Sequence, residues 1–223
     1  CLTGDASGSG VLFDSPLDFG HQAFAACLAG NDGDTLWEAL VGHSFAGILG
    51  HGIAVRPDGG AVLVGTFNAT ITIDGVETPT FGDHSPTNFG VVYDGADSVA
   101  GIGLLANEDW GIIGDAQNQT GRDVAIDDDG NIYIVGAFLG SLDFGGAAID
   151  STDNTHFDAY VGSLDASGGM RWALGLGNES PQVAVGVSAG TDHIAIVGSF
   201  QGNLLGATAS ANDDMWLLGL DFE

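Results

Sequence analysis

Short apolar segments separated by turn residues run along the whole chain. Residues 61–65, 131–136 and 193–198 are rich in Val, Ile and aromatic side chains, and Gly, Asp, Asn or Ser bounds each segment. This is the pattern of β-strands, and no convincing amphipathic helix accompanies it. Strands that recur with turns every 8–12 residues or so predict an all-β sandwich, barrel or propeller.

An internal repeat decides among these folds. Residues 60–67, 131–138 and 193–200 align with one another and end in Gly-x-Phe. A Trp precedes each of them, a second strand segment lies between the Trp and the Phe, and a further strand follows. Each unit therefore predicts four strands, which we name a (with the Trp), b, c (with the Gly and Phe) and d. Three Trp residues mark the units: Trp37, Trp110 and Trp172.

Residues 11–30 match only the second half of this unit. A four-stranded antiparallel sheet with two apolar faces cannot cover both alone, so such units stack face to face as propeller blades. We therefore predict an all-β, small β-propeller-like fold of about four blades: three four-stranded repeats plus an N-terminal half-blade. The half-blade is either two-stranded, extended by residues 94–109, or completed by another chain.

The best copy of the repeat runs from residue 110 to residue 172. It carries Val124-Ala-Ile-Asp127, Gly130-Asn-Ile-Tyr-Ile-Val-Gly-Ala-Phe138 and Leu142-Asp-Phe-Gly-Gly146, then Asp158-Ala-Tyr160 and Leu164-Asp-Ala-Ser-Gly168. This code resembles the bacterial beta-propeller repeat family of the SBBP type, and the degraded copies extend the resemblance to about residues 11–223. The resemblance implies an exported or surface-attached protein and brings no catalytic residues with it.

Charge narrows the range of partners. The chain has 30 acidic residues, three Arg and no Lys, for a formal charge of −27. Almost no cation is present to replace the counterions of nucleic acid or to dock on anionic lipid, so we expect neither as a direct partner. Hydrophobic residues make up 44% of the chain, which argues against disorder. The lack of Lys fits an exported protein or a salty habitat, where net charge keeps a Gly-rich surface soluble.

The first residue, Cys1, precedes a run of small polar residues that ends at Gly10. This start is similar to that of a mature bacterial lipoprotein, so we expect a lipid on Cys1 and a flexible tether at residues 1–10. A single propeller domain would span residues 11–223, at the outer membrane or cell surface, or outside the cell. The alternative is a disulfide to Cys27, which an exported setting permits. The two hypotheses exclude each other because a thioether to lipid consumes the Cys1 sulfur.

Candidate chemistry is sparse. The His residues form no zinc pattern, and nucleophile, phosphate-loop and dinucleotide motifs are missing from the sequence. Asp127, Asp129 and Asn131 look like part of a calcium loop, but the terminal Glu of such a loop is missing and the segment also suits a turn. We predict no catalytic residue and no cofactor, and we favour a turn over calcium at these three positions.

The sequence therefore predicts a non-catalytic scaffold or accessory subunit that acts through protein–protein contacts. Its partners would be other chains or copies of itself, because an incomplete blade leaves an edge open to strand addition. The alternative is a glycan-binding or glycan-cleaving propeller, a hydrolase or lyase that uses the axial end. The expected partner contacts are Val11, Phe13, Leu17, Phe19, Phe24, Leu28, Trp216 and Leu218.

Overall fold

The computed structural model describes residues 1–7, 10–12, 15–17, 21–44, 48–67, 72–73, 76–77, 87–93, 101–102, 118–144, 148–210 and 213–221. Within these ranges the regular elements are all β-strands. The prediction of an all-β fold is therefore confirmed. The described part of the chain has no helix long and apolar enough to cross a membrane.

Four antiparallel sheets follow one another along the chain. The first contains β1 (Leu2–Ser7), β4 (His21–Leu28) and β5 (Thr35–Ser44), and the second contains β6 (Ile48–Val55), β7 (Ala61–Phe67), β10 (Thr87–Tyr93) and β11 (Gly101–Ile102). The third contains β12 (Gln119–Ile126), β13 (Ile132–Phe138), β16 (Asp158–Leu164) and β17 (Met170–Leu176). The fourth contains β18 (Gln182–Ala189), β19 (His193–Phe200) and β22 (Asp214–Asp221).

Each sheet also carries a small two-stranded hairpin between its strands c and d. The same plan therefore occurs four times, which explains why the sequence repeats. The four hairpins are β2 (Gly10–Leu12) with β3 (Ser15–Leu17), β8 (Thr72–Ile73) with β9 (Val76–Glu77), β14 (Ser141–Asp143) with β15 (Ala148–Asp150), and β20 (Asn203–Leu204) with β21 (Ala207–Thr208).

The division of the repeat into sheets differs from the prediction. In the two copies whose strand a is described, that strand pairs with strand d of the preceding copy, because a tight turn joins the two strands. Trp172 of β17 thus lies opposite Ser163 of β16, and Trp37 of β5 lies opposite Cys27 of β4. The predicted equivalence of Trp37 and Trp172 is confirmed, whereas Trp110 lies outside the described residues. The order of strands in a sheet is thus b-c-d-a, and within the described residues the first sheet shows no strand b and the last no strand a.

Residues 2–7 are not the flexible tether that we expected. They form β1, which pairs with β4 over its full length. The register places Gly4 opposite Phe24, as Gly136 lies opposite Tyr160 and Gly198 opposite Trp216. β1 is therefore a strand c that the repeat search missed. The tether prediction fails here because pairing with β1 satisfies backbone N–H and C=O groups of β4 that would otherwise lie on a bare edge.

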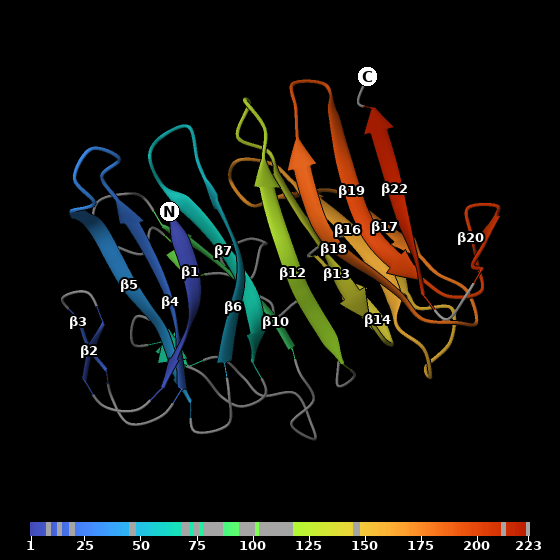
Figure 1. The fold of residues 1–223 in the computed structure, drawn as a ribbon, viewed down its shortest axis with the longest axis horizontal. Coiled ribbons are helices and arrows are strands. Elements are labelled where there is room, and N and C mark those ends of the chain that lie inside the picture. Colours follow the sequence, from blue (N-terminus) through green and yellow to red (C-terminus); the bar gives the residue numbers. More distant parts are fainter. Residues whose placement is uncertain are drawn as a thin grey trace.

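The sheets stand side by side in sequence order, from the first at the left to the last at the right (Figure 1). β6 contacts β1 and β4, β12 contacts β6 and β7, and β18 contacts β12, β13 and β16. Strands b thus form the seams between neighbouring sheets. The first and last sheets lie at opposite ends of the longest axis, so the described sheets form an open stack (Figure 1).

The third sheet is buried on both faces. One face of β13 presents Ile134 and Phe138 to a core shared with Val62 and Val64 of the second sheet. The other face presents Tyr133 and Val135, with neighbours from the fourth sheet. Alternate residues of a strand point to opposite faces, so one strand serves two cores. This arrangement makes the middle of the stack the best-covered part of the molecule.

Candidate interaction site

The fourth sheet is buried on one face and open on the other. Ile194, Ile196 and Trp216 lie in the core shared with the third sheet, and the Trp216 indole N–H donates a hydrogen bond to the Ser199 carbonyl oxygen at 3.1 Å. Their neighbours in sequence point the opposite way: Met215 is 83% exposed and Leu217 is 73% exposed. Exposed apolar surface of this kind is common at interaction sites.

The internal repeat gives a direct measure of what is missing. Asp158 lies opposite Phe138 in the third sheet, and Asp214 lies opposite Phe200 in the fourth, so β16 and β22 are in the same register. The residues of β16 that are equivalent to Met215, Leu217 and Gly219 are all 0% exposed: Ala159, Val161 and Ser163. The fourth sheet covers these residues, and nothing described covers their counterparts on β22.

The outer edge of β22 is the second open feature. In the other three sheets, strand d pairs with an outer strand, namely β5, β11 or β17. Among the described residues no strand pairs with the outer edge of β22, and a hollow of about 540 Å³ lies beside the first half of this strand. Polar and apolar groups both line it, and they come from β19, the β20–β21 hairpin and β22: Phe200, Leu204, Leu205, Ala207, Thr208, Asp214, Met215, Trp216 and Leu217.

Leu205 at the rim of this hollow has an unusual backbone. It is the only described non-glycine residue with a positive φ, at 50°, and its side chain is exposed. A bulky side chain in the left-handed region costs free energy that Gly or Asn would avoid. In the third sheet the matching hairpin touches the outer strand, since β15 contacts β17. Leu205 is thus an apolar residue held in a strained turn beside an unoccupied strand position.

The predicted contact residues divide between the two ends of the stack. Trp216 is buried and Leu218 packs against the same core, so the prediction chose the wrong face of this strand. The exposed residues are Met215 and Leu217, which alternate with them. At the other end Val11 is exposed, while Phe24 and Leu28 are half-buried. Of Leu17 only the backbone is described, in β3, and Phe13 and Phe19 lie outside the described residues.

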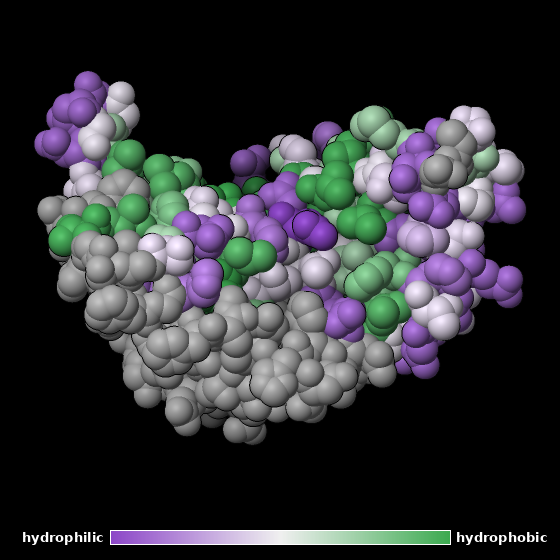
Figure 2. All heavy atoms as spheres, turned by 60° about the horizontal axis from the view of Figure 1, so that its bottom comes forward, coloured by the Kyte–Doolittle hydropathy of each residue, from purple (hydrophilic) through white to green (hydrophobic). Residues whose placement is uncertain are grey.

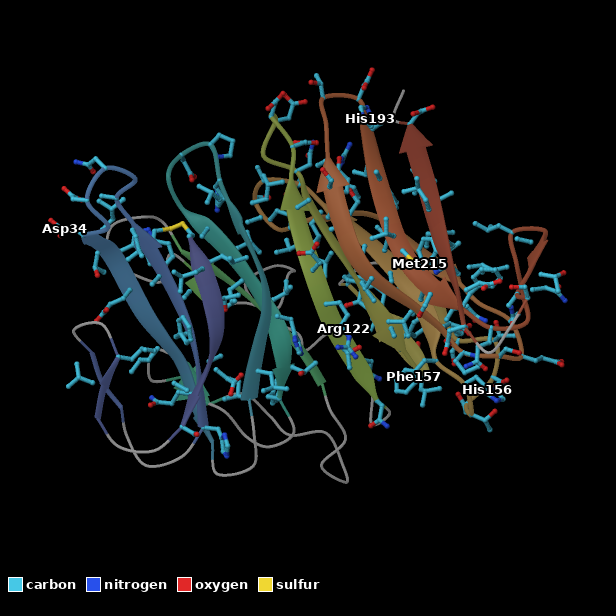
Figure 3. The ribbon with its side chains drawn as sticks, viewed as in Figure 1. Asp34, Arg122, His156, Phe157, His193 and Met215 are labelled. Carbon is cyan, nitrogen blue, oxygen red and sulfur yellow. A yellow bond between two sulfur atoms is a disulfide. The ribbon has the colours of Figure 1, made fainter. Side chains whose placement is uncertain are left out.

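A disulfide joins Cys1 to Cys27 (Figure 3). Leu2 lies opposite Ala26, so the register of β1 on β4 brings the two cysteines together across the strands. The structure therefore contradicts the prediction of a lipid on Cys1, because the Cys1 sulfur is already bonded. The sequence contained the correct alternative, but the strand character of residues 2–7 was needed to choose it.

The three calcium candidates form a turn. Asp127 Oδ1 accepts hydrogen bonds from the backbone N–H groups of Asp129 and Asn131, at 3.0 and 2.8 Å. Its Oδ2 accepts from Asn131 Nδ2 at 2.8 Å and from the Tyr133 hydroxyl at 2.9 Å. Burial opposes ionisation of this carboxyl, but the four donors outweigh it and lower the pKa of Asp127. The described residues contain no group of three or more His, Cys, Asp or Glu suited to a metal ion.

The Asp127 turn is tied to the next strands by a polar network. The Arg171 guanidinium donates to the Tyr133 hydroxyl at 3.2 Å and to the Ser163 hydroxyl at 3.4 Å. Burial raises the pKa of Tyr133, and its hydrogen bond to Asp127 acts in the same direction. Tyr133 therefore stays a hydroxyl donor at neutral pH. The network orders one end of the third sheet.

The strands b of the second, third and fourth sheets each carry a β-bulge at the same place. The register shifts between Gly50 and Gly52, between Gly121 and Asp123, and between Ala184 and Gly186. The extra residues are His51, Arg122 and Val185. Bulges re-aim side chains and recur next to functional surfaces. Sequence reasoning missed this row, although a Gly beside each bulge residue was the available signal.

Charge along this row is uneven. Arg122 lies near the middle of the stack (Figure 3). Burial lowers the pKa of His51, the Arg122 charge lowers it further, and the Asp5 carboxylate raises it. His51 Nε2 also lies 3.0 Å from the Thr66 hydroxyl oxygen. Asp5, His51 and Arg122 come from the first, second and third sheets, so these interactions connect neighbouring sheets.

Comparison with known proteins agrees with this architecture. A family model described as a beta-propeller repeat, SBBP, matches residues 112–137. The match covers most of β12 and β13, the b and c strands of the third sheet. This part of the chain is therefore similar to an SBBP-type propeller repeat. No curated protein matches the chain.

Proposed function

We propose that this chain is an exported, non-catalytic scaffold protein that binds an extended segment of another protein along β22. The bound segment would add an outer strand a to the fourth sheet. The observation that carries the proposal is that no described strand pairs with the outer edge of β22, whereas β5, β11 and β17 pair with the equivalent strands of the other sheets. A hollow of about 540 Å³ lies beside the first half of β22.

The same physical argument applies to the outer edge of strand d in all four sheets. An edge strand presents unpaired N–H and C=O groups that template the addition of a further strand. In such binding the main chain supplies affinity and side-chain pockets supply specificity. The hollow supplies the pocket, and Leu205 on its rim supplies an apolar contact. Export is supported by the Cys1–Cys27 disulfide, since disulfides persist in oxidising compartments.

The sequence of β17 suggests a probe. β17 pairs with β16 as Leu176 opposite Ala159 through Met170 opposite Leu164. A synthetic peptide with the sequence of residues 169–177 would meet β22 in the same register. We expect saturable binding of the fluorescently labelled peptide and slower hydrogen exchange of the amides of residues 214–221.

Two controls make this test specific. A peptide in which Pro replaces Leu174 has no backbone N–H group to donate at that position and should not bind. In the protein, Leu205→Glu should weaken binding of the unmodified peptide, because a carboxylate would replace an apolar side chain in the lining of the hollow. Equal binding of the two peptides, or no protection of residues 214–221 at saturation, would contradict the proposal.

A further inference from the structure

The three arginines of the chain are used in different ways. Arg56 forms an ion pair with Asp58 at 2.9 Å, and Arg171 donates hydrogen bonds to two hydroxyl groups of the third sheet. Arg122 is exposed, and among the residues that the structure describes its guanidinium forms neither an ion pair nor a hydrogen bond. In a chain with 30 acidic residues, an arginine without an acidic partner is unexpected. Its guanidinium is therefore available to an anion from outside the chain.

Arg122 lies beside His51 at the seam between the second and third sheets. The two are the extra residues of the β-bulges in β12 and β6. The residues that follow them are in contact, since a methyl group added at Gly52 would lie 2.8 Å from the α-carbon of Asp123. The charge of Arg122 also lowers the pKa of His51. Two side chains that carry positive charge when protonated thus meet at one seam.

The second sheet adds a hydroxyl group and an apolar side chain to this seam. Val62 and Val64 of β7 lie in the core shared with the third sheet, and Thr66 is the next residue on their face of the strand. The Thr66 hydroxyl oxygen is buried and lies 3.0 Å from His51 Nε2. Leu49 lies opposite Thr66 and is 42% exposed. Cationic, polar and apolar groups therefore occur close together here.

The nearest acidic groups do not pair with Arg122. Asp123 Oδ2 accepts a hydrogen bond from the backbone N–H of Val187 at 3.0 Å, so this carboxylate is directed at the fourth sheet. Burial raises the pKa of Tyr160, which interacts with the Arg122 charge, so its hydroxyl carries no negative charge at neutral pH. Acids farther away are screened, because the Debye length is about 8 Å at physiological ionic strength. The positive charge of Arg122 is thus left without a counter-charge of its own chain.

The seam lies where the surface changes character. Arg122 is near the middle of the stack (Figure 3). Figure 2 shows hydrophilic residues gathered in the middle of the described surface, with hydrophobic residues on either side of them. A ligand that carries one charged group and one apolar group would match both parts of such a surface.

We propose that the seam between β6 and β12 binds a small monocarboxylate with an apolar tail. The carboxylate would lie between the guanidinium of Arg122 and the imidazole of His51, with the tail against Leu49. A guanidinium matches a carboxylate well, because two parallel N–H groups reach its two oxygens. A single negative charge is favoured over a polyanion, because each further charge is repelled by the net −27 of the chain. This site is separate from β22 and goes beyond the proposed function.

Sodium hexanoate is the probe. In NMR spectra of the ¹⁵N-labelled protein at constant ionic strength, we expect saturable shifts of the Arg122 Nε–H signal and of the His51 ring. Acetate, which lacks the tail, should shift the same signals with at least about fivefold weaker affinity, because it buries less apolar area. 1-Hexanol, which lacks the carboxylate, should shift neither signal. Equal effects of hexanol and hexanoate, or no effect of hexanoate, would overturn the proposal.

Variants of two arginines test the position of the site. Arg122→Gln removes the charge and should weaken hexanoate binding at least about tenfold. Arg122→Lys retains the charge without the planar fork, so it should bind with intermediate affinity. Arg56→Gln is the matched control and should bind as the unmodified chain does, because Arg56 is already paired with Asp58. Folding of each variant is checked by circular dichroism. Undiminished binding to folded Arg122→Gln would overturn the site.

The titration of His51 provides a second readout. The charged groups that act on His51 are Arg122 of β12 and Asp5 of β1. A carboxylate bound beside the ring should raise the pKa of His51, since it favours the imidazolium form. By linkage, the affinity for hexanoate should increase as the pH falls through the pKa of His51. An unchanged His51 titration at saturating hexanoate would place the ligand elsewhere and overturn the proposal. The peptide experiment on β22 does not depend on this result, so the two proposals fail separately.

Discussion

The ring of Tyr160 lies over the α-carbon of Gly136, its partner across β13 and β16. A methyl group added at Gly136 would lie 2.9 Å from Tyr160 Cε1 and would also overlap the Thr120 carbonyl oxygen of β12. Gly4 and Phe24, and Gly198 and Trp216, repeat this cross-strand pair in the first and fourth sheets. An aromatic ring that covers a strand glycine is thus the signature of the repeat in three dimensions.

This pair predicts a strong effect of one methyl group. Gly136→Ala should lower the free energy of unfolding by about 2 kcal/mol or more, because both the ring and the β12 backbone would have to move. The matched control is Gly175→Ala, where the nearest atom to the new methyl group is Phe138 Cζ at 3.6 Å, an ordinary contact. Urea denaturation of both variants checks this. Equal losses at the two positions would mean that the close approach at Gly136 does not matter.

The disulfide predicts a redox-dependent stability. It links residues separated by 26 positions, so breaking it should lower the free energy of unfolding by about 3 kcal/mol. Thermal unfolding with and without reductant measures the change, and Cys27→Ser should reproduce the reduced value without reductant. The intact mass should be two hydrogens below that of the reduced chain. A mass increased by acyl groups would instead restore the lipid hypothesis.

The turn at Asp127 predicts acid sensitivity. Because its pKa is lowered in the folded state, the carboxylate contributes stability above its ordinary pKa, and this contribution is lost as the pH falls through the lowered value. Asp127→Ala should cost about 1–3 kcal/mol at pH 7, since it leaves the buried Tyr133 hydroxyl without its acceptor. The variant should also lose less further stability in acid than the unmodified chain.

A second Asp turn serves as the control for this prediction. Asp165 accepts hydrogen bonds from Ser167 and Gly169, in a turn like that of Asp127, but all its donors are local. Asp165→Ala should therefore cost less than Asp127→Ala. If Asp165→Ala proved the more harmful of the two, the reach of Asp127 to Tyr133 would not be its main contribution.

His51 predicts a change of stability nearer neutral pH. Burial and the Arg122 charge lower its pKa, so the unfolded chain binds a proton more readily than the folded chain. The free energy of unfolding should therefore fall as the pH drops from 6.5 towards the lowered pKa, and be constant above that window as far as His51 is concerned. Arg122→Gln should make this fall smaller. A steeper fall in Arg122→Gln would show that the two side chains do not interact as described.

The sequence predicted the elements better than their assembly. Strands c and d were visible because Gly65, Gly136 and Gly198 share one local pattern. The pairing of β17 with β16 could not be predicted from the sequence, because a repeating series of four strands can be divided into units at any of them. Only the backbone register shows that Trp172 belongs to the sheet of Ser163. Which strand begins a sheet depends on how the strands pair, and the order of strands along the sequence does not show this.

The site was harder to predict for two further reasons. β1 has the sequence Leu-Thr-Gly-Asp-Ala-Ser, which lacks the Val and Ile of the other strands c. Its strand character comes from its partner β4 and from the disulfide, both of which lie far along the chain. On β22, the predicted contact residue Trp216 lies on the face that the third sheet covers, and the exposed residues are the ones that alternate with it. Hydrophobicity alone does not tell the two faces of an apolar strand apart.

The position of the Cys1–Cys27 bond also determines how the molecule would respond to force. A pull on residue 1 would otherwise peel β1 from β4 one hydrogen bond at a time, as a zipper opens. With the sulfur link at the pulled end of β1, tension passes through the covalent bond directly into β4, an interior strand of its sheet. The load must then be resisted by the hydrogen bonds of β4 acting together in shear. Under oxidising conditions the first sheet would thus be a mechanically stiff attachment point, and reduction would make it soft.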